Sequence, residues 1–130
     1  MDSATMGEVF GEVISSYSRA QAIEDGVLID VSEVAKEAGI KFPVAVTRTV
    51  WDGYIVPDPR AEKYGQSESG RLWDVLNLLR HAARRGGSEL IFAVYFIMKE
   101  RQKRLVTLKA VCGPGDEAEP VITVMLPEED

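Results

Sequence analysis

Hydrophobic positions along the chain change their spacing near residue 88, which divides the sequence into a mainly helical part and a strand part. Between residues 67 and 85 the apolar side chains recur three or four positions apart, at Leu72, Val75, Leu76, Leu79, Ala82 and Ala83. That spacing places them on one face of a helix. Ser67 or Ser69 can cap its start, and Gly86 with Gly87 can end it. We therefore predict a long amphipathic helix here.

After residue 88 the apolar side chains follow the two-residue period of β-strands. Strands are predicted at residues 89–99, 104–112 and 120–126, and their short connections predict an antiparallel meander. Both faces of the first strand are apolar, so we expect it to be covered on both sides. The cover is either the helices between residues 9 and 50 or another copy of the protein, which makes a homodimer one hypothesis.

Short elements with their own start and stop residues fill the N-terminal part. Spacing predicts a short helix at residues 8–15, and Ser18 with Gln21 forms a capping box for a second helix that Gly26 ends. A strand is predicted at residues 27–31, followed by a helix at residues 33–38 with Ser32 as its cap. Strand and helix compete at residues 44–50; the helix is favoured from residue 45 to 51, and Asp52 with Gly53 is expected to stop it. Residues 57–66 are predicted to form an exposed loop.

Together these elements predict one α+β domain over residues 1–130, with several short N-terminal helices and one long amphipathic helix packed on a three-stranded antiparallel β-meander. A length of 130 residues with 45% hydrophobic residues suits one core. Residues 1–6 and 127–130 are expected to be frayed. No apolar run reaches the roughly 18 residues of a membrane span, and residues 1–5 lack a secretory signal pattern. We therefore predict a cytoplasmic protein with no membrane partner.

Residues suited to catalysis or metal binding are scarce. The chain has one cysteine, Cys112, and one histidine, His81, too few for a disulfide or a standard zinc site. Cys112 lies in an alternating apolar run that predicts a buried, inert thiol, and His81 lies near the end of the predicted helix, where the dipole suits an imidazolium. No phosphate-loop, dinucleotide, zinc-hydrolase or nucleophile-elbow motif occurs. We therefore expect no cofactor, no metal and no catalytic residue.

Charge is segregated along the chain, although the net charge is only −6. Residues 80–109 hold 8 basic and 2 acidic side chains, and residues 110–130 hold 6 acidic and no basic ones. If the end of the long helix and the hairpin tip are neighbours, one basic patch could contact nucleic-acid phosphates. The contacting residues would be Arg80, Arg84, Arg85, Arg101, Lys103 and Arg104. Compensation of the helix dipole and protection of a strand edge explain the same charges, and overall acidity favours that explanation.

Four side chains between residues 17 and 54 are not accounted for by local caps and turns. These are Arg19, Asp30, Arg48 and Trp51, which we predict as a binding pocket. An enzyme with its pocket near Arg19 and Asp30 is a further alternative. Such a pocket requires the four side chains to converge on one cleft. It would not exist if Arg19 and Arg48 paired with acids on the outside of the molecule.

Several segments of the chain carry a resemblance to known proteins: YSRAQAIEDGVLIDV at residues 17–31, FPVAVT at residues 42–47, Trp51, and GRLWDVL at residues 70–76. They resemble a family of small uncharacterised proteins found on bacterial plasmids, phages and mobile elements, over roughly residues 14–112. The resemblance implies a bacterial, mobile-element setting and no particular catalytic residue. The leading hypothesis is a non-enzymatic binding or protein-interaction accessory protein with an unknown protein partner. A nucleic-acid-binding protein and an enzyme are the alternatives.

Overall fold

The structure is a computed structural model that describes residues 17–62, 65–98 and 102–129. The predicted helix at residues 8–15, the predicted fraying of residues 1–6 and the predicted contact residue Arg101 lie outside the described residues. Within the described ranges, none of the helices has the length and apolarity needed to cross a membrane.

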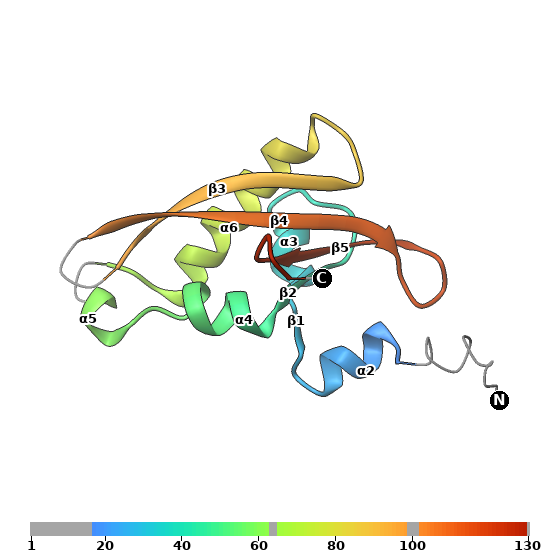
Figure 1. Cartoon of the computed structure of the whole chain (residues 1–130), viewed down its shortest axis with the longest axis horizontal. Helices are drawn as coiled ribbons and strands as arrows, with labels where there is room; N and C mark the ends of the chain where they lie inside the picture. The colour runs from blue at the N-terminus through green and yellow to red at the C-terminus, as the bar shows by residue number, and fades with distance from the viewer. Residues whose placement is uncertain (1–16, 63–64, 99–101, 130) are drawn as a thin grey trace.

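The described strands form one five-stranded mixed sheet in the order β1-β2-β5-β4-β3 (Figure 1). They are β1 Leu28–Asp30, β2 Val44–Thr47, β3 Glu89–Ile97, β4 Lys103–Pro114 and β5 Pro120–Met125. β2 pairs with β5 in parallel, and the other neighbours are antiparallel. The predicted three-stranded antiparallel meander is therefore wrong, because the N-terminal part of the chain contributes two further strands to its free edge.

The helices are α2 Arg19–Glu24, α3 Ser32–Glu37, α4 Arg48–Val50, the π-helix η2 Trp51–Ile55, α5 Pro59–Glu62 and α6 Glu68–Ala83. The predicted capping box of α2 is confirmed: the Ser18 hydroxyl accepts from the Gln21 N–H at 3.0 Å, and the Gln21 side chain accepts from the Ser18 N–H at 3.1 Å. Ser67 caps α6 by accepting from the Gly70 N–H. Both caps act within one turn, so they form wherever the local sequence allows.

Other local predictions are wrong because long-range pairing decides these segments. Ser32 is the first residue of α3 and not its cap; its hydroxyl instead accepts from the Val44 N–H at 3.0 Å and so joins α3 to β2. Residues 44–47 form a strand on β5, where a helix was favoured from residue 45. Helical structure passes through Asp52 and Gly53 to Ile55. The predicted loop at residues 57–66 contains α5.

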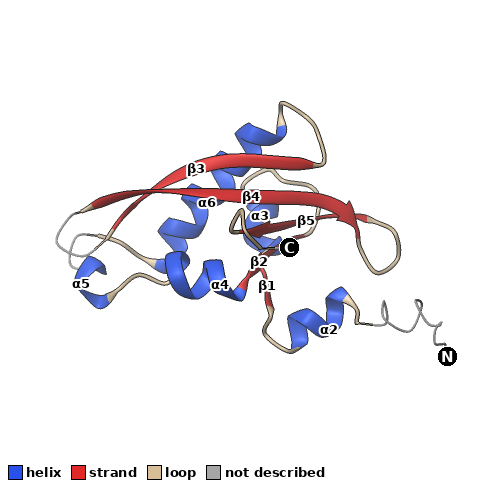
Figure 2. Ribbon diagram, in the orientation of Figure 1, coloured by secondary structure: helices blue, strands red, loops and turns tan. Residues whose placement is uncertain are grey.

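The main core lies between α6 and one face of the sheet, which we call the inner face (Figure 2). Leu72, Val75, Leu76 and Leu79 of α6 are buried with Leu90, Phe92, Val94 and Phe96 of β3. Arg71 is buried in the same layer and donates to the carbonyl oxygens of Tyr54 and Ile97 and to the Gln66 side chain. Burial lowers the pKa of Arg71. This arginine joins η2, α6 and the end of β3.

The opposite face of the sheet, which we call the outer face, is divided. On β2 and β5 it is buried, with Ala45 1%, Val121 5% and Met125 6% exposed. On β3 and the first residues of β4 it is exposed, since Ile91 is 53%, Tyr95 64% and Leu105 54% exposed, whereas Lys109 further along β4 is buried. Among the described helices between residues 17 and 50, none covers the exposed outer side chains of β3; the first part of the predicted cover, residues 9–16, lies outside the described residues. Coverage by another copy stays a prediction.

Candidate functional site

The four residues predicted as a pocket do not meet in one cleft. Arg19 and Asp30 line a hollow of about 190 Å³, whereas Asp30 and Trp51 line another of about 290 Å³. Arg48 lines a third hollow of about 720 Å³, beside Thr47 and Glu129. Asp30 and its neighbour Ser32 thus line both of the first two hollows, and Arg48 is separate from both. A binding role for the four residues stays a prediction.

Arg19 is tied into the fold by several hydrogen bonds. Its guanidinium donates to the Thr123 hydroxyl at 2.7 Å and to the Ile122 carbonyl at 2.8 Å, and its backbone N–H donates to Asp116 at 2.8 Å. Burial lowers the pKa of Arg19, while the charges of Asp30, Asp116 and Glu119 act in the opposite direction. These contacts anchor α2 to β5 and to the turn that follows β4.

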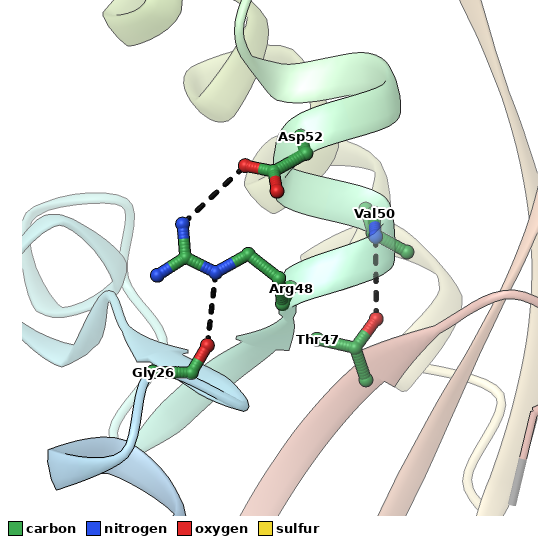
Figure 3. A network of polar contacts seen from close by, with 5 residues as sticks. All are labelled: Gly26, Thr47, Arg48, Val50 and Asp52. Atoms are coloured by element: carbon green, nitrogen blue, oxygen red, sulfur yellow. Dashed lines mark hydrogen bonds and ion pairs between the residues drawn. The ribbon is translucent and has the colours of Figure 1, made fainter.

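Arg48 bridges two local elements (Figure 3). Its Nε donates to the Gly26 carbonyl at 2.9 Å, and its Nη1 lies 3.4 Å from the Asp52 carboxylate, in an ion pair that is at least half exposed. Gly26 has a φ of +80°, and a Cβ there would lie 2.9 Å from Nη2 of Arg48. Glycine is therefore needed both for the turn and for the approach of the guanidinium. These contacts account for Arg48 without a ligand.

Asp30 and Trp51 also have contacts within the fold. The Asp30 carboxylate accepts from the Ser32 N–H at 3.0 Å and from the Ser32 hydroxyl at 2.6 Å, which closes the turn between β1 and α3. Trp51 is partly buried and packs against the core. No cluster of three His, Cys, Asp or Glu side chains among the described residues could hold a metal ion.

The basic residues between 80 and 104 separate into two groups. Arg80, Arg84 and Arg85 lie at the end of α6, beside the start of β3, whereas Lys103 and Arg104 lie at the start of β4, at the opposite end of the sheet (Figure 1). The nine residues of β3 separate the groups by roughly 30 Å. The Arg104 guanidinium lies 5.8 Å from the centre of the Tyr54 ring. The two groups therefore do not form one patch, and contact with nucleic acid stays a prediction for each.

Arg80 and Arg84 line a groove of about 480 Å³ that sequence reasoning did not find. Lys41 and Phe42, from the loop before β2, complete its rim, and Cys112 of β4 lines it as well. Cys112 is only partly buried. Charge alone drew attention to the two arginines, but the loop is some 40 residues earlier in the chain and reaches them only through the fold.

The described part of the chain thus defines a small α+β protein built on a five-stranded mixed sheet. Residues 6–130 match the sequence model of a family of unknown function (DUF6573), and the chain belongs to this family. Neither the curated proteins nor the solved structures gave a match to the chain.

Proposed function

We propose that the protein is a non-enzymatic protein-interaction protein, and that its interaction surface is the exposed outer face of β3 and the first residues of β4. The observation that carries the proposal is the exposed apolar stripe of Ile91, Tyr95 and Leu105. Tyr95 lies directly opposite Leu105 in the β3–β4 register, and Ile91 lies on the same face of β3, four residues before Tyr95. Aromatic residues and contiguous apolar surface are typical of contact sites between proteins.

The stripe borders an edge strand that is open to pairing. β3 is the last strand in the sheet order, and its sequence, ELIFAVYFI, has no proline and no charged residue after Glu89. Edge strands of soluble proteins usually carry charges, prolines or bulges that prevent pairing with another chain. The nine residues of β3 lack the first two of these devices over most of their length. This favours pairing as the use of the edge.

A second copy of this chain is the partner that fits this edge. In an antiparallel pairing of two β3 strands centred on Ala93, Ile91 of each copy lies opposite Tyr95 of the other. The two stripes then join into one apolar surface across the dimer, with two-fold symmetry. Self-association by this route builds one sheet of ten strands from two sheets of five.

We also infer a bacterial, cytoplasmic protein of a plasmid, phage or other mobile element that acts as an accessory to a protein partner. The support is the resemblance of residues 17–31, 42–47 and 70–76 to small proteins from those sources. A dimeric apolar surface gives such an accessory protein a site at which a further partner can dock.

Light scattering and sedimentation at up to high micromolar concentration test the self-association. We expect a dimer for the wild type. Tyr95→Lys should raise the dissociation constant several-fold, because it removes the two cross-strand pairs of Tyr95 with Ile91 of the other copy, each of which contributes about 0.2 to 1 kcal/mol. Leu78→Lys is the matched control, since Leu78 is an exposed apolar residue of α6 at 39% exposure and lies away from the stripe. A wild-type protein that remains monomeric contradicts the proposal.

Disulfide formation tests the register, in a Cys112→Ser background. Ala93→Cys should cross-link under mild oxidation, since the two copies of residue 93 face each other across the two-fold axis. Thr107→Cys is the control: Thr107 lies opposite Ala93 on β4, so its two copies are about three strand spacings, or roughly 14 Å, apart. Equal cross-linking of the two variants would exclude this pairing.

A further inference from the structure

We propose that the groove between the end of α6 and the loop before β2 binds a small amphiphilic anion, meaning an apolar body with a carboxylate or phosphate head. This inference goes beyond the proposed self-association and does not depend on it. It assigns a role to Arg80 and Arg84 at the end of α6, whose side chains have no partner among the described residues.

The floor of the groove is apolar. Ile40, Leu90 and Ile122 line it and are 8%, 7% and 3% exposed, so they form its base. Phe42 lines it too but is 48% exposed, which places an aromatic ring at the rim. A volume of about 480 Å³ lies within the range of small-molecule sites. An apolar ligand body of that size would cover the exposed part of the Phe42 ring and the small part of the floor that is still open to water.

The rim is cationic. Lys41, Arg80 and Arg84 line the groove, and its lining contains no aspartate or glutamate. In the described ranges none of these three side chains has a hydrogen bond or an ion pair with another residue. By contrast, Arg48 pairs with Asp52 and Lys109 pairs with Glu89. Three unpaired cations around one apolar hollow, in a chain of net charge −6, indicate an anionic head on the ligand.

Gly39 lies close to one of these cations. It ends α3 with a φ of +94°, and a Cβ there would lie 3.1 Å from Nε of Arg80. The arginine side chain therefore passes close to the loop backbone, at a position where the positive φ favours glycine. This places the Arg80 guanidinium beside the groove, where its planar donors suit a carboxylate or a phosphate.

Size and polarity favour a small ligand over a macromolecule. A protein partner of ordinary affinity buries about 800 Å² on each side, which is far more surface than this hollow offers. A nucleic-acid strand would engage the three cations through its phosphates but would leave the apolar floor without a partner. An amphiphile can contact both parts of the groove, because its anionic head can pair with the cationic rim while its apolar body packs on the floor.

Isothermal titration calorimetry with decanoate and with decyl phosphate tests the proposal and separates the two head groups. We expect saturable binding of at least one of them, and none of decylamine, which has the same body and the opposite charge. The double variant Arg80→Gln, Arg84→Gln should weaken binding by at least about tenfold, because it removes two charge-assisted contacts to the head group. Arg85→Gln is the control, since Arg85 is the neighbouring cation and does not line the groove.

Cys112 provides a second readout, because it is the only cysteine of the chain and lines the groove. Iodoacetamide should alkylate its thiol more slowly when decanoate or decyl phosphate occupies the site. Alkylation by the anionic reagent iodoacetate, relative to iodoacetamide, should fall in the Arg80→Gln, Arg84→Gln variant and stay unchanged in Arg85→Gln. This measurement places the ligand at the groove, apart from the exposed stripe on β3.

Three results would overturn the proposal: no binding of either anion at millimolar concentration, unchanged affinity in the double variant, or binding that leaves Cys112 unprotected. Tighter binding of an acidic peptide or of single-stranded RNA, with no binding of either decyl anion, would also overturn it. Sedimentation of the same samples distinguishes this failure from failure of the proposed self-association. The wild type can dimerise without binding an anion, or bind an anion as a monomer.

Discussion

The two halves of the outer face of the sheet differ although they belong to one surface. On β2 and β5 the face is buried, and segments distant in sequence hold it closed: Arg19 donates to Thr123, and Thr47 donates to Glu129. On β3 and β4 the face carries exposed Ile91 and Tyr95. A sheet of uniformly apolar strands can thus have one half closed by the ends of its own chain and the other half left for a partner.

The contrast separates residues that serve the fold from residues that serve recognition. Around the closed half, Lys109 donates to the Glu129 carbonyl at 2.8 Å and pairs with Glu89 at 3.6 Å. The cations at the groove, Arg80 and Arg84, have no such partner in the described part of the chain. Groups with satisfied contacts explain stability, whereas exposed cations without a protein partner are hydrated and can exchange that water for an anionic ligand.

The largest expected effect comes from placing the same charge in each half. Ala45→Lys buries an unpaired ammonium at a position that is 1% exposed, and we expect it to lower the free energy of unfolding by about 3 to 5 kcal/mol. Ala93→Lys, on the same face of exposed β3, should change it by less than about 0.5 kcal/mol. Urea unfolding at low micromolar concentration, where association contributes little, measures both. Similar losses in the two variants would show that the halves do not differ.

A smaller loss of stability is expected at the C-terminal turn that covers the closed half of the outer face, on β2 and β5. The Glu129 carboxylate accepts from the Thr47 hydroxyl at 2.9 Å and from the Leu126 N–H at 2.8 Å. Glu129→Ala leaves both donors without this partner and should lower the free energy of unfolding by about 1 to 2 kcal/mol. The neighbouring exposed acid provides the control, Glu128→Ala, which should have little effect. If the two variants unfold alike, the turn does not hold the half closed.

The sequence predicted elements whose signals are local and missed those decided by distant pairing. Ser18 and Gln21 cap α2 within one turn, so their pattern sufficed. Residues 44–47 have apolar spacing that also suits a helix, and only pairing with β5 makes them a strand. The same limit applies to Ser32, whose hydroxyl is used by Val44 and not as a cap.

The candidate groove was predictable only in part for the same reason. Arg80 and Arg84 stand out in a charge count, but the count also included Lys103 and Arg104 at the far end of the sheet. Lys41 and Phe42 carry no signal of their own, since a lysine and a phenylalanine before a proline are ordinary loop residues. The fold brings the loop to the arginines, and the spacing of hydrophobic residues along the sequence cannot predict that contact.

The smallest expected effect concerns the pH dependence of the free energy of unfolding, and it arises at Asp116. Its carboxylate accepts from the backbone N–H groups of Arg19 and Ala20 at 2.8 and 3.0 Å, at the start of α2. These bonds, foremost that from Arg19, lower the pKa of Asp116 below its usual value of 3.8. The unfolded state then binds more protons than the folded state as the pH falls through 3.8, so the stabilisation is complete above about pH 4 and is lost below it.

Thermal unfolding between pH 5 and pH 2 should therefore show a steeper fall of the melting temperature for the wild type than for Asp116→Asn, which does not titrate. Its single amide oxygen replaces the two carboxylate oxygens that accept from Arg19 and Ala20. Glu117→Gln removes the next acid along the chain and should follow the wild type. NMR titration of the Arg19 and Ala20 amides should report the same transition directly, since their N–H groups touch the carboxylate. Parallel acid curves for the wild type and Asp116→Asn would mean that α2 is held mainly by the contacts of Arg19 with β5.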